Sequence, residues 1–289
     1  MLLVTLALCA FPPDVRPATA EPVELPSGGT TTCAVVGAAS LATATPEKAE
    51  SKDDPVGELA RMETRDKIRL EATFYPVPRA KDPLPAVLLI HDLGSDRSQL
   101  VPLVEKLLKE KLCVLAIDLR GHGTSATEDL DWSKLEEVQR ERLTPFMRDD
   151  VNAALDWLTA DSRVIGTRIG IVGQGFGGLL GLRAARDERI VNLTMIEPAL
   201  EDHGYRLSAL LPDAEGLPMQ IVVGKDEEQP IDDLIKSENI DYVEMRTVKA
   251  ERGALFEDKR LAAALGKWID TYREGAQSQG GFRMNGAGK

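Results

Sequence analysis

Four short polar segments of the chain contain groups that can take part in chemistry. They are residues 91–94 (HDLG), 118–123 (DLRGHG), 173–178 (GQGFGG) and 224–227 (GKDE). Histidine and carboxylate side chains serve as general bases and acids. The backbone N–H groups of a glycine-rich turn at the start of a helix favour anions. These residue types therefore suit either a hydrolytic reaction or the binding of an anionic ligand.

Each of these segments begins at the last residue of a largely apolar run that predicts a buried strand. The runs are residues 85–91, 112–118, 168–173 and 219–224. Continuous apolar runs are typical of strands that are buried on both faces of a parallel sheet. In open α/β sheets, ligands bind beyond the carboxyl ends of the strands, where these four segments stand.

The rest of the core alternates in the same way between strands and helices. An alternating apolar pattern predicts a strand with one solvent face at residues 67–75. Further strands are predicted at residues 191–196 and 242–248, and helices near residues 100–108, 148–160, 176–183, 231–236 and 261–269. This alternation predicts an α/β fold, a mostly parallel sheet flanked by helices on both faces.

Composition excludes several classes of protein. The chain has 289 residues, 43% of them apolar and 28% charged, which is enough to bury a core and excludes fibrous and fully disordered proteins. The chain has 35 Lys and Arg residues against 47 Asp and Glu residues, so its net charge is 35 − 47 = −12. This negative charge argues against nucleic-acid binding. No apolar run approaches the roughly 18–20 residues of a transmembrane helix. The three Cys form no CxxC pair, so neither a metal site nor a disulfide framework is predicted, and no cofactor is expected.

Sequence patterns also suggest the boundaries of the folded part. Residues 1–20 combine a short apolar stretch with a small-residue site at Ala18 and Ala20, which favours a signal peptide. Residues 21–57 read as a disordered linker and residues 275–289 as a flexible tail, leaving a domain at 58–274. We therefore expect an exported protein, periplasmic or secreted, with a cytoplasmic one as the alternative.

Together with residues 252–256 (RGALF), the four polar segments resemble those of the α/β-hydrolase superfamily, in the same order along the chain. In that family, a His-Gly pair shapes the oxyanion hole, and a Gly-x-Ser-x-Gly turn between strand and helix forms the nucleophile elbow. An acid follows the penultimate strand and a His follows the last. The resemblance implies an α/β-hydrolase fold, without a large cap because residues 199–217 are too few for one.

The residues at the positions of the family triad are Gly175 for the nucleophile, Asp226 or Glu227 for the acid, and Arg252 for the base. Glycine has no side chain to attack a substrate. A guanidinium stays protonated, so it cannot accept the proton of a nucleophile. Two of the three roles are therefore lost by this alignment.

The surroundings of the triad are altered as well. Asp92 replaces the Gly of the His-Gly pair, and the expected crevice is lined by His91, Asp92, Leu93, Gln174, Phe176 and Glu227. The resemblance implies that the backbone N–H groups of Leu93 and Phe176 point into the crevice, where they and Arg252 would hold a carboxylate-bearing ligand. His91 and His122 are expected to be structural. For His203, an exposed loop position is expected.

The elbow Ser of active hydrolases has positive φ, a strained conformation that glycine adopts without strain. Gly175 in that conformation fits a chain that has lost its activity. We therefore expect a non-catalytic pseudo-hydrolase that binds a small molecule or a partner protein. The alternative is an active ester or amide hydrolase of the esterase, lipase or peptidase type, with a non-standard nucleophile or base.

Overall fold

A computed structural model describes residues 56–249, 255 and 259–274. The predicted signal peptide at 1–20, residues 21–55 of the predicted linker, the predicted tail at 275–289 and Arg252 all lie outside the described residues. Those boundaries therefore remain predictions from the sequence.

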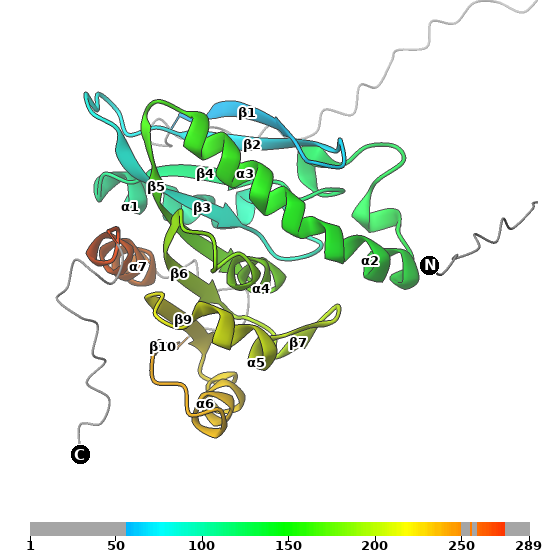
Figure 1. The fold of residues 1–289 in the computed structure, drawn as a ribbon, viewed down its shortest axis with the longest axis vertical. Coiled ribbons are helices and arrows are strands. Elements are labelled where there is room, and N and C mark those ends of the chain that lie inside the picture. Colours follow the sequence, from blue (N-terminus) through cyan, green and yellow to red (C-terminus); the bar gives the residue numbers. More distant parts are fainter. Residues whose placement is uncertain (1–55, 250–254, 256–258, 275–289) are drawn as a thin grey trace, which may run out of the picture. The chain divides into compact units, whose positions relative to one another are not determined.

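The described residues form an eight-stranded sheet in the order β1-β2-β4-β3-β5-β6-β9-β10 (Figure 1). β1 pairs antiparallel with β2 and β2 antiparallel with β4, and every other neighbouring pair is parallel. The predicted mostly parallel sheet is thereby confirmed. The strands are β1 Glu58–Glu63, β2 Arg69–Tyr75, β3 Leu84–Ile90, β4 Cys113–Ile117, β5 Val164–Gln174, β6 Ile190–Ile196, β9 Met219–Gly224 and β10 Val243–Val248.

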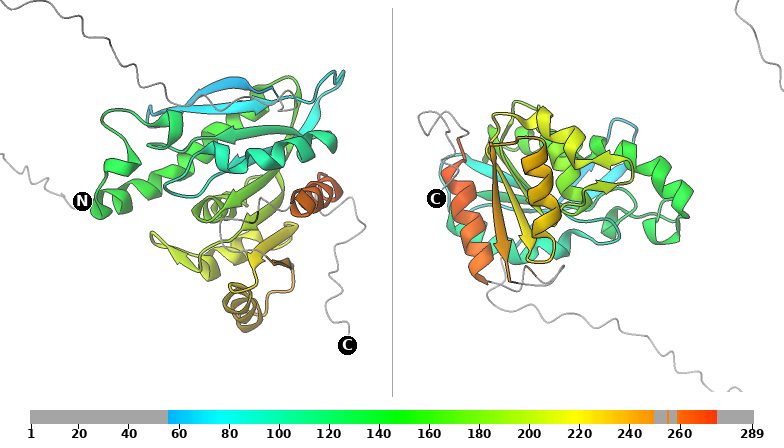
Figure 2. Two further views of the ribbon diagram at one scale, coloured as in Figure 1. Left: turned by 180° about the vertical axis from the view of Figure 1, so that it is seen from behind. Right: turned by 90° about the horizontal axis from the view of Figure 1, so that it is seen from below.

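Helices cover both faces of this sheet (Figure 2). Successive residues of β3 point to opposite faces of the sheet and are buried on both. Leu88 packs in the hydrophobic cluster that includes α3 and α4, whereas Leu89 packs in the cluster that includes α1 and α7. α6 lies with the first group through Ile231. The helices are α1 Val101–Lys109, α3 Arg148–Ala160, α4 Phe176–Arg183, α6 Glu228–Ser237 and α7 Lys259–Thr271.

β1 was not predicted from the sequence. Its segment ELARME buries only Ala60, and it is an edge strand that pairs with β2 alone. An edge strand with little apolar burial carries too weak a period-2 pattern to be recognised.

Two connections rise beyond the carboxyl ends of the strands. Between β4 and α3 lie the 3₁₀ helices η2 Gly123–Ser125, η3 Trp132–Lys134 and η4 Thr144–Met147, together with α2 Glu137–Leu143. Between β6 and β9 lie a hairpin of β7 Glu201–Asp202 and β8 Tyr205–Arg206, then α5 Leu207–Leu210 and η5 Leu211–Ala214. The second connection is a hairpin and two short helical turns, as expected for a fold without a large cap.

A buried ion cluster fixes the first of these connections. The Arg120 side chain is 2% exposed and pairs with Asp150 on α3 at 2.7 Å and with Asp66 at 2.7 Å. Asp150 also accepts a hydrogen bond from the backbone N–H of Arg120 at 2.9 Å. A buried charge that is paired and hydrogen-bonded on several sides has little freedom to move, so the loop at residues 118–123 is held against α3.

Candidate active site

Gly175 is the sharp turn between β5 and α4. Its backbone has φ 52° and ψ −120°, and α4 begins at the next residue, Phe176. This region of backbone space is strained for residues with a Cβ and open to glycine. The neighbouring Gly177 serves a different need, because a Cβ there would lie 2.4 Å from the carbonyl oxygen of Ile90 on the adjacent strand. The turn therefore has the shape expected of an elbow, without a nucleophile.

The side chain of Asp92 fills the space above this turn. A Cβ added to Gly175 would lie 2.2 Å from Cγ and 2.2 Å from Oδ1 of Asp92. Asp92 Oδ1 accepts hydrogen bonds from the backbone N–H of Phe176 at 2.8 Å and of Leu93 at 2.9 Å. These are the two N–H groups that were expected to point at a ligand. In the structure, their acceptor is a carboxylate of the chain itself.

His91 and His122 are both buried and both use their two ring nitrogens on the backbone. Nε2 of His91 accepts from the N–H of Leu119 at 3.0 Å, and its Nδ1 lies 2.7 Å from the Asp92 carbonyl oxygen. Nε2 of His122 accepts from the N–H of Gly94 at 3.1 Å, and its Nδ1 lies 2.9 Å from the Arg120 carbonyl oxygen. Each ring therefore carries its proton on Nδ1 and joins two loops.

The charge state of these rings agrees with that geometry. Burial, reinforced by the nearby His91, lowers the pKa of His122 to about 4. Burial also lowers the pKa of His91. The ring centroids lie 5.1 Å apart, so a second positive charge would be unfavourable as well. Both rings are neutral near pH 7, and they hold the loops around Asp92 in place.

Gln174, just before the elbow, is buried and donates through Nε2 to Glu197 Oε2 at 3.1 Å. Glu197 follows β6, is 2% exposed and has φ 49°. Sequence reasoning singled out Gln174 and missed Glu197. The available signal was a carboxylate directly after the apolar run at 191–196, at the carboxyl end of a strand.

The two candidates for the acid position differ in their surroundings. Asp226 is exposed, whereas Glu227 is half-buried and precedes α6, with its N–H donating to the Gly224 carbonyl at 3.1 Å. Arg252 lies outside the described residues. The choice between Asp226 and Glu227 therefore stays as open as the sequence left it.

His203 is not the exposed loop residue that was expected. Its side chain is 16% exposed, and Nδ1 lies 2.5 Å from Asp202 Oδ1. The ring centroid lies 5.7 Å from that of Trp132 and 6.0 Å from that of Phe176. His203 stands at the tip of the β7–β8 hairpin with φ 44°, and Gly204 follows with φ 80°. This is the tight hairpin turn with two positive φ values, which folds the ring back over the residue after the elbow.

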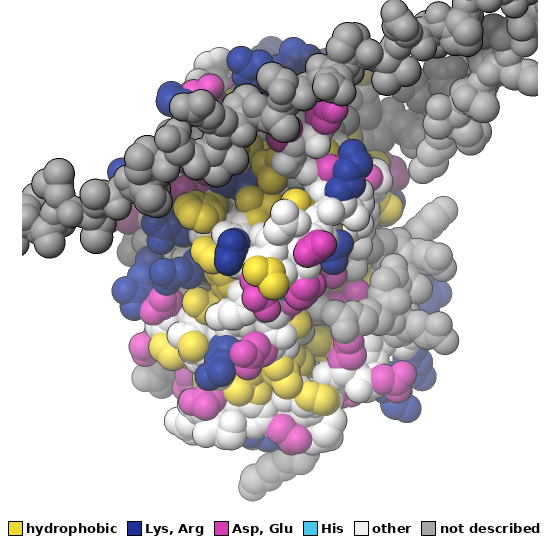
Figure 3. Space-filling model, turned by 90° about the vertical axis from the view of Figure 1, so that its right-hand side faces the viewer, with side chains coloured by type: hydrophobic (Ala, Val, Ile, Leu, Met, Phe, Trp, Pro, Cys, Tyr) yellow, Lys and Arg dark blue, Asp and Glu magenta, His cyan; other side chains and the backbone are white. Residues whose placement is uncertain are grey.

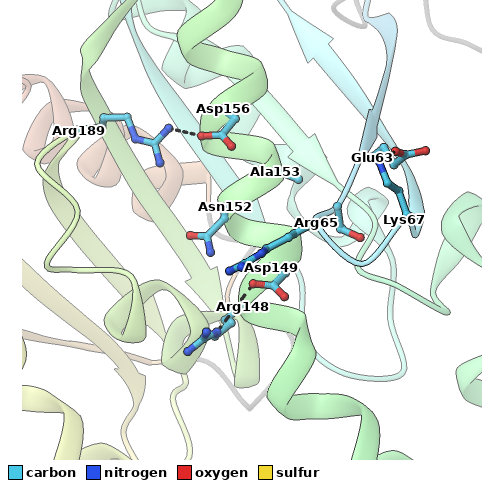
Figure 4. A pocket seen from close by; sticks show the side chains of 10 residues that line it. Glu63, Arg65, Lys67, Arg148, Asp149, Asn152, Ala153, Asp156 and Arg189 are labelled. Atoms are coloured by element: carbon cyan, nitrogen blue, oxygen red, sulfur yellow. Dashed lines mark hydrogen bonds and ion pairs between the residues drawn. The ribbon is translucent and has the colours of Figure 1, made fainter.

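Two cavities of about 550 Å³ lie elsewhere on the described part of the chain. One lies between α3 and the β1–β2 turn (Figure 4), and the other is lined by the β7–β8 hairpin and residues of α4 and α5. In the first, Arg189 pairs with Asp156 at 2.6 Å, and Arg148 lies 3.8 Å from Asp149. Neither Gly175 nor Asp92 lines either cavity.

The described ranges contain no group of three or more His, Cys, Asp or Glu placed to hold a metal ion. Among the helices that the structure describes, none is long and apolar enough to cross a membrane.

Comparisons with known proteins bear on both family and fold. The sequence model of the "Alpha/beta hydrolase family" matches residues 87–285. No curated protein matches the chain. Many solved structures match it as well.

An esterase from Pyrococcus furiosus is 17% identical, with 75% of this chain and 91% of that chain covered and a TM-score of 0.59. A dienelactone hydrolase from Anabaena variabilis is also 17% identical, with 76% and 97% covered and a TM-score of 0.55. A 2,6-dihydroxy-pseudo-oxynicotine hydrolase is 17% identical, with 75% and 68% covered and a TM-score of 0.59. At these identities, the likeness shows a shared fold.

Proposed function

Since the chain belongs to the alpha/beta hydrolase family, we propose that it is a non-catalytic member that binds a small molecule or a partner protein. One observation carries this proposal. The carboxylate of Asp92 occupies the space of an elbow side chain and accepts the N–H groups of Leu93 and Phe176. Stabilising the oxyanion of a tetrahedral intermediate needs such donors free and pointing at the substrate.

The electrostatics of this arrangement also oppose ester hydrolysis. A tetrahedral intermediate carries its negative charge at the oxyanion position. A negative oxygen of Asp92 lies there already, so a substrate oxyanion would meet a like charge in place of two donors. Gly175 supplies no nucleophile beside it.

The test is direct. We expect the purified domain to hydrolyse short p-nitrophenyl esters no faster than an unrelated protein, and a fluorophosphonate probe to label no Ser. Heat-denatured protein is the control for non-specific labelling. Labelling of a unique Ser, or turnover that survives repurification and is abolished by Asp226→Ala, would overturn the proposal.

One observation favours the second candidate, an active hydrolase with a non-standard base. The Asp202–His203 pair, 2.5 Å apart, packs against Phe176, next to the elbow. A carboxylate on one ring nitrogen orients a His for proton transfer at the other. If this candidate holds, the wild type hydrolyses esters and His203→Ala abolishes that turnover.

We also propose export, which rests on the leader-like residues 1–20. Expression of the full chain in an export-competent bacterium, followed by intact-mass analysis of the periplasmic fraction, tests this. A protein found only in the cytoplasm at its full mass would count against export.

A further inference from the structure

Arg140 and His203 meet at Trp132, and the proposed non-catalytic function gives neither side chain a role. Arg140 projects from α2, and His203 stands at the tip of the β7–β8 hairpin. Both converge on Trp132, whose ring lies 5.3 Å from Arg140 Cζ and whose centroid lies 5.7 Å from that of His203. Segments about 60 residues apart in the chain thus place a guanidinium and an imidazole against one indole.

Each of these side chains has a buried nitrogen that lacks a hydrogen-bond partner among the described residues. The atoms are Arg140 Nε and His203 Nε2. A buried donor without an acceptor is costly and is rare in native proteins unless it has a ligand, a water or a function. The other nitrogen of His203 is already taken by Asp202. Arg140 Nε is therefore a donor that the described residues leave without an acceptor, and His203 Nε2 becomes a second such donor when the ring is protonated.

A single carboxylate, that of Glu137, stands close to both groups. Its Oε1 lies 3.5 Å from His203 Nε2, and its Oε2 lies 4.0 Å from Arg140 Nη1. Both distances exceed those of good hydrogen bonds. The Glu137 side chain is 65% exposed, whereas those of Arg140 and His203 are 31% and 16% exposed. This largely exposed carboxylate thus stands near His203 Nε2 and near Nη1 of Arg140, and it is not a hydrogen-bond partner of Arg140 Nε.

We infer that Arg140 and His203 form a binding site for the carboxylate group of a small organic acid, which displaces the side chain of Glu137. The inference rests on the proposed function, that this region binds a ligand. The imidazole held by Asp202 donates from Nε2 once it is protonated, and a guanidinium donates from several nitrogens, so one carboxylate can bridge both. A monoanion suits the site better than a dianion, because Asp92, Asp202 and the overall charge of −12 are all negative.

Exposed apolar residues on α2, which carries Arg140, and directly before the β7–β8 hairpin, which carries His203, suit an acid with an apolar body. Val138 follows Glu137 on α2 and is 55% exposed, and Leu200 precedes β7 and is 43% exposed. Figure 3 shows hydrophobic side chains gathered among charged ones on the side of the molecule where α2 and β7 lie. Hexanoate, with a carboxylate and a five-carbon tail, is therefore a suitable probe.

The test is isothermal titration of the full chain with hexanoate, with hexanamide as the neutral control. We expect hexanoate to bind and hexanamide to bind at least tenfold more weakly. Arg140→Gln and His203→Gln should each weaken hexanoate about tenfold or more, the size of a lost charge-assisted hydrogen bond. Arg142→Gln, which changes an exposed Arg of the same helix, should have no effect.

The variant with the sharpest outcome is Glu137→Gln. It removes the competing carboxylate and keeps its size, so hexanoate should bind several-fold more tightly. A merely structural role for the cluster predicts no such gain. Melting curves identify any variant that fails to fold, and Arg140→Lys, which keeps the charge, should lose less affinity than Arg140→Gln.

Three results would overturn the inference. They are no hexanoate binding to the wild type, equal affinity for Arg140→Gln, and no gain from Glu137→Gln. An esterase assay on the same preparation separates this inference from the proposed function. Ester turnover counts against the proposed function whatever the titrations show, whereas an absence of hexanoate binding without turnover overturns only the carboxylate site.

Discussion

The carboxylate of Asp92 occupies the space in which a side chain at Gly175 would begin. The separation between a Gly175 Cβ and Asp92 Cγ would be 2.2 Å, far inside van der Waals contact. Each residue therefore constrains the other. An active elbow needs a side chain at 175 and free N–H groups at 93 and 176, and the Asp92 carboxylate in its observed position leaves room for neither.

The first prediction concerns the stability of the elbow. Gly175→Ala should lower the free energy of unfolding by about 1–3 kcal/mol or more, because it adds backbone strain and a collision with Asp92. Gly216→Ala is the matched control, since Gly216 has φ +85° but nothing within 4 Å of an added Cβ. Urea denaturation should show a larger loss for Gly175→Ala than for Gly216→Ala. A higher midpoint for Gly175→Ala would contradict the elbow conformation.

The second prediction concerns restored activity. Gly175→Ser alone should leave ester hydrolysis near background, because no base removes its proton and Asp92 holds the oxyanion donors. Gly175→Ser with Arg252→His rebuilds the family pattern. Adding Asp92→Gly frees the N–H groups of Leu93 and Phe176, so the triple variant should exceed the double variant.

The size of that last step has a physical basis. Loss of one oxyanion donor in a serine hydrolase costs about 10²–10³ in turnover. Initial rates with p-nitrophenyl acetate measure the comparison, and the triple variant with Asp226→Ala added tests the acid. If Gly175→Ser alone matches the triple variant, then Arg252 does not stand at the base position.

The third prediction concerns pH. The pKa of His122 is about 4 in the folded protein and about 6.5 when unfolded, so the unfolded chain binds more protons between these values. The neutral His122 ring therefore contributes its full share to the free energy of unfolding above about pH 6.5. This share, about 3 kcal/mol in all, is lost as the pH falls toward 4. Urea denaturation from about pH 4 to 7 should therefore show a smaller slope for His122→Gln than for wild type. Equal slopes would show that the pKa of His122 is the same in the folded and the unfolded chain.

The fourth prediction concerns the face of the sheet beneath α7. Thr194 on β6 is fully buried, and its Oγ1 has no hydrogen-bond partner among the described residues. Thr194→Val removes the orphaned hydroxyl and should raise the free energy of unfolding by about 1 kcal/mol. In the control, Thr144→Val, the lost hydroxyl donates to the Glu141 carbonyl at 3.3 Å, so that variant should be less stable. Thermal melts of the two variants compare them, and a destabilised Thr194→Val would indicate a bound water at Oγ1.

The sequence alone determined the fold class and the place of the sharp turn between β5 and α4. β3 and β4 are continuous apolar runs, β9 is interrupted only by Gln220, and the helices between them repeat their apolar residues at helical spacing. Such patterns are local, since they record whether one or both faces of an element are buried. The glycines around Gly175 were informative for the same reason, because a positive φ or a close backbone approach restricts the residue type at a single position.

Only the tertiary structure decided what fills the site. Asp92 and Phe176 are 84 positions apart, and their hydrogen bond exists because β3 and β5 are neighbours in the sheet. Two further contacts depend in the same way on which strands and hairpins are neighbours in the fold. They are the hydrogen bond between Gln174 and Glu197 and the packing of His203 against Phe176 and Trp132. No local pattern marks Asp92 as the residue that accepts the N–H groups of Leu93 and Phe176, because the second of these contacts depends on its distance to a backbone elsewhere in the chain.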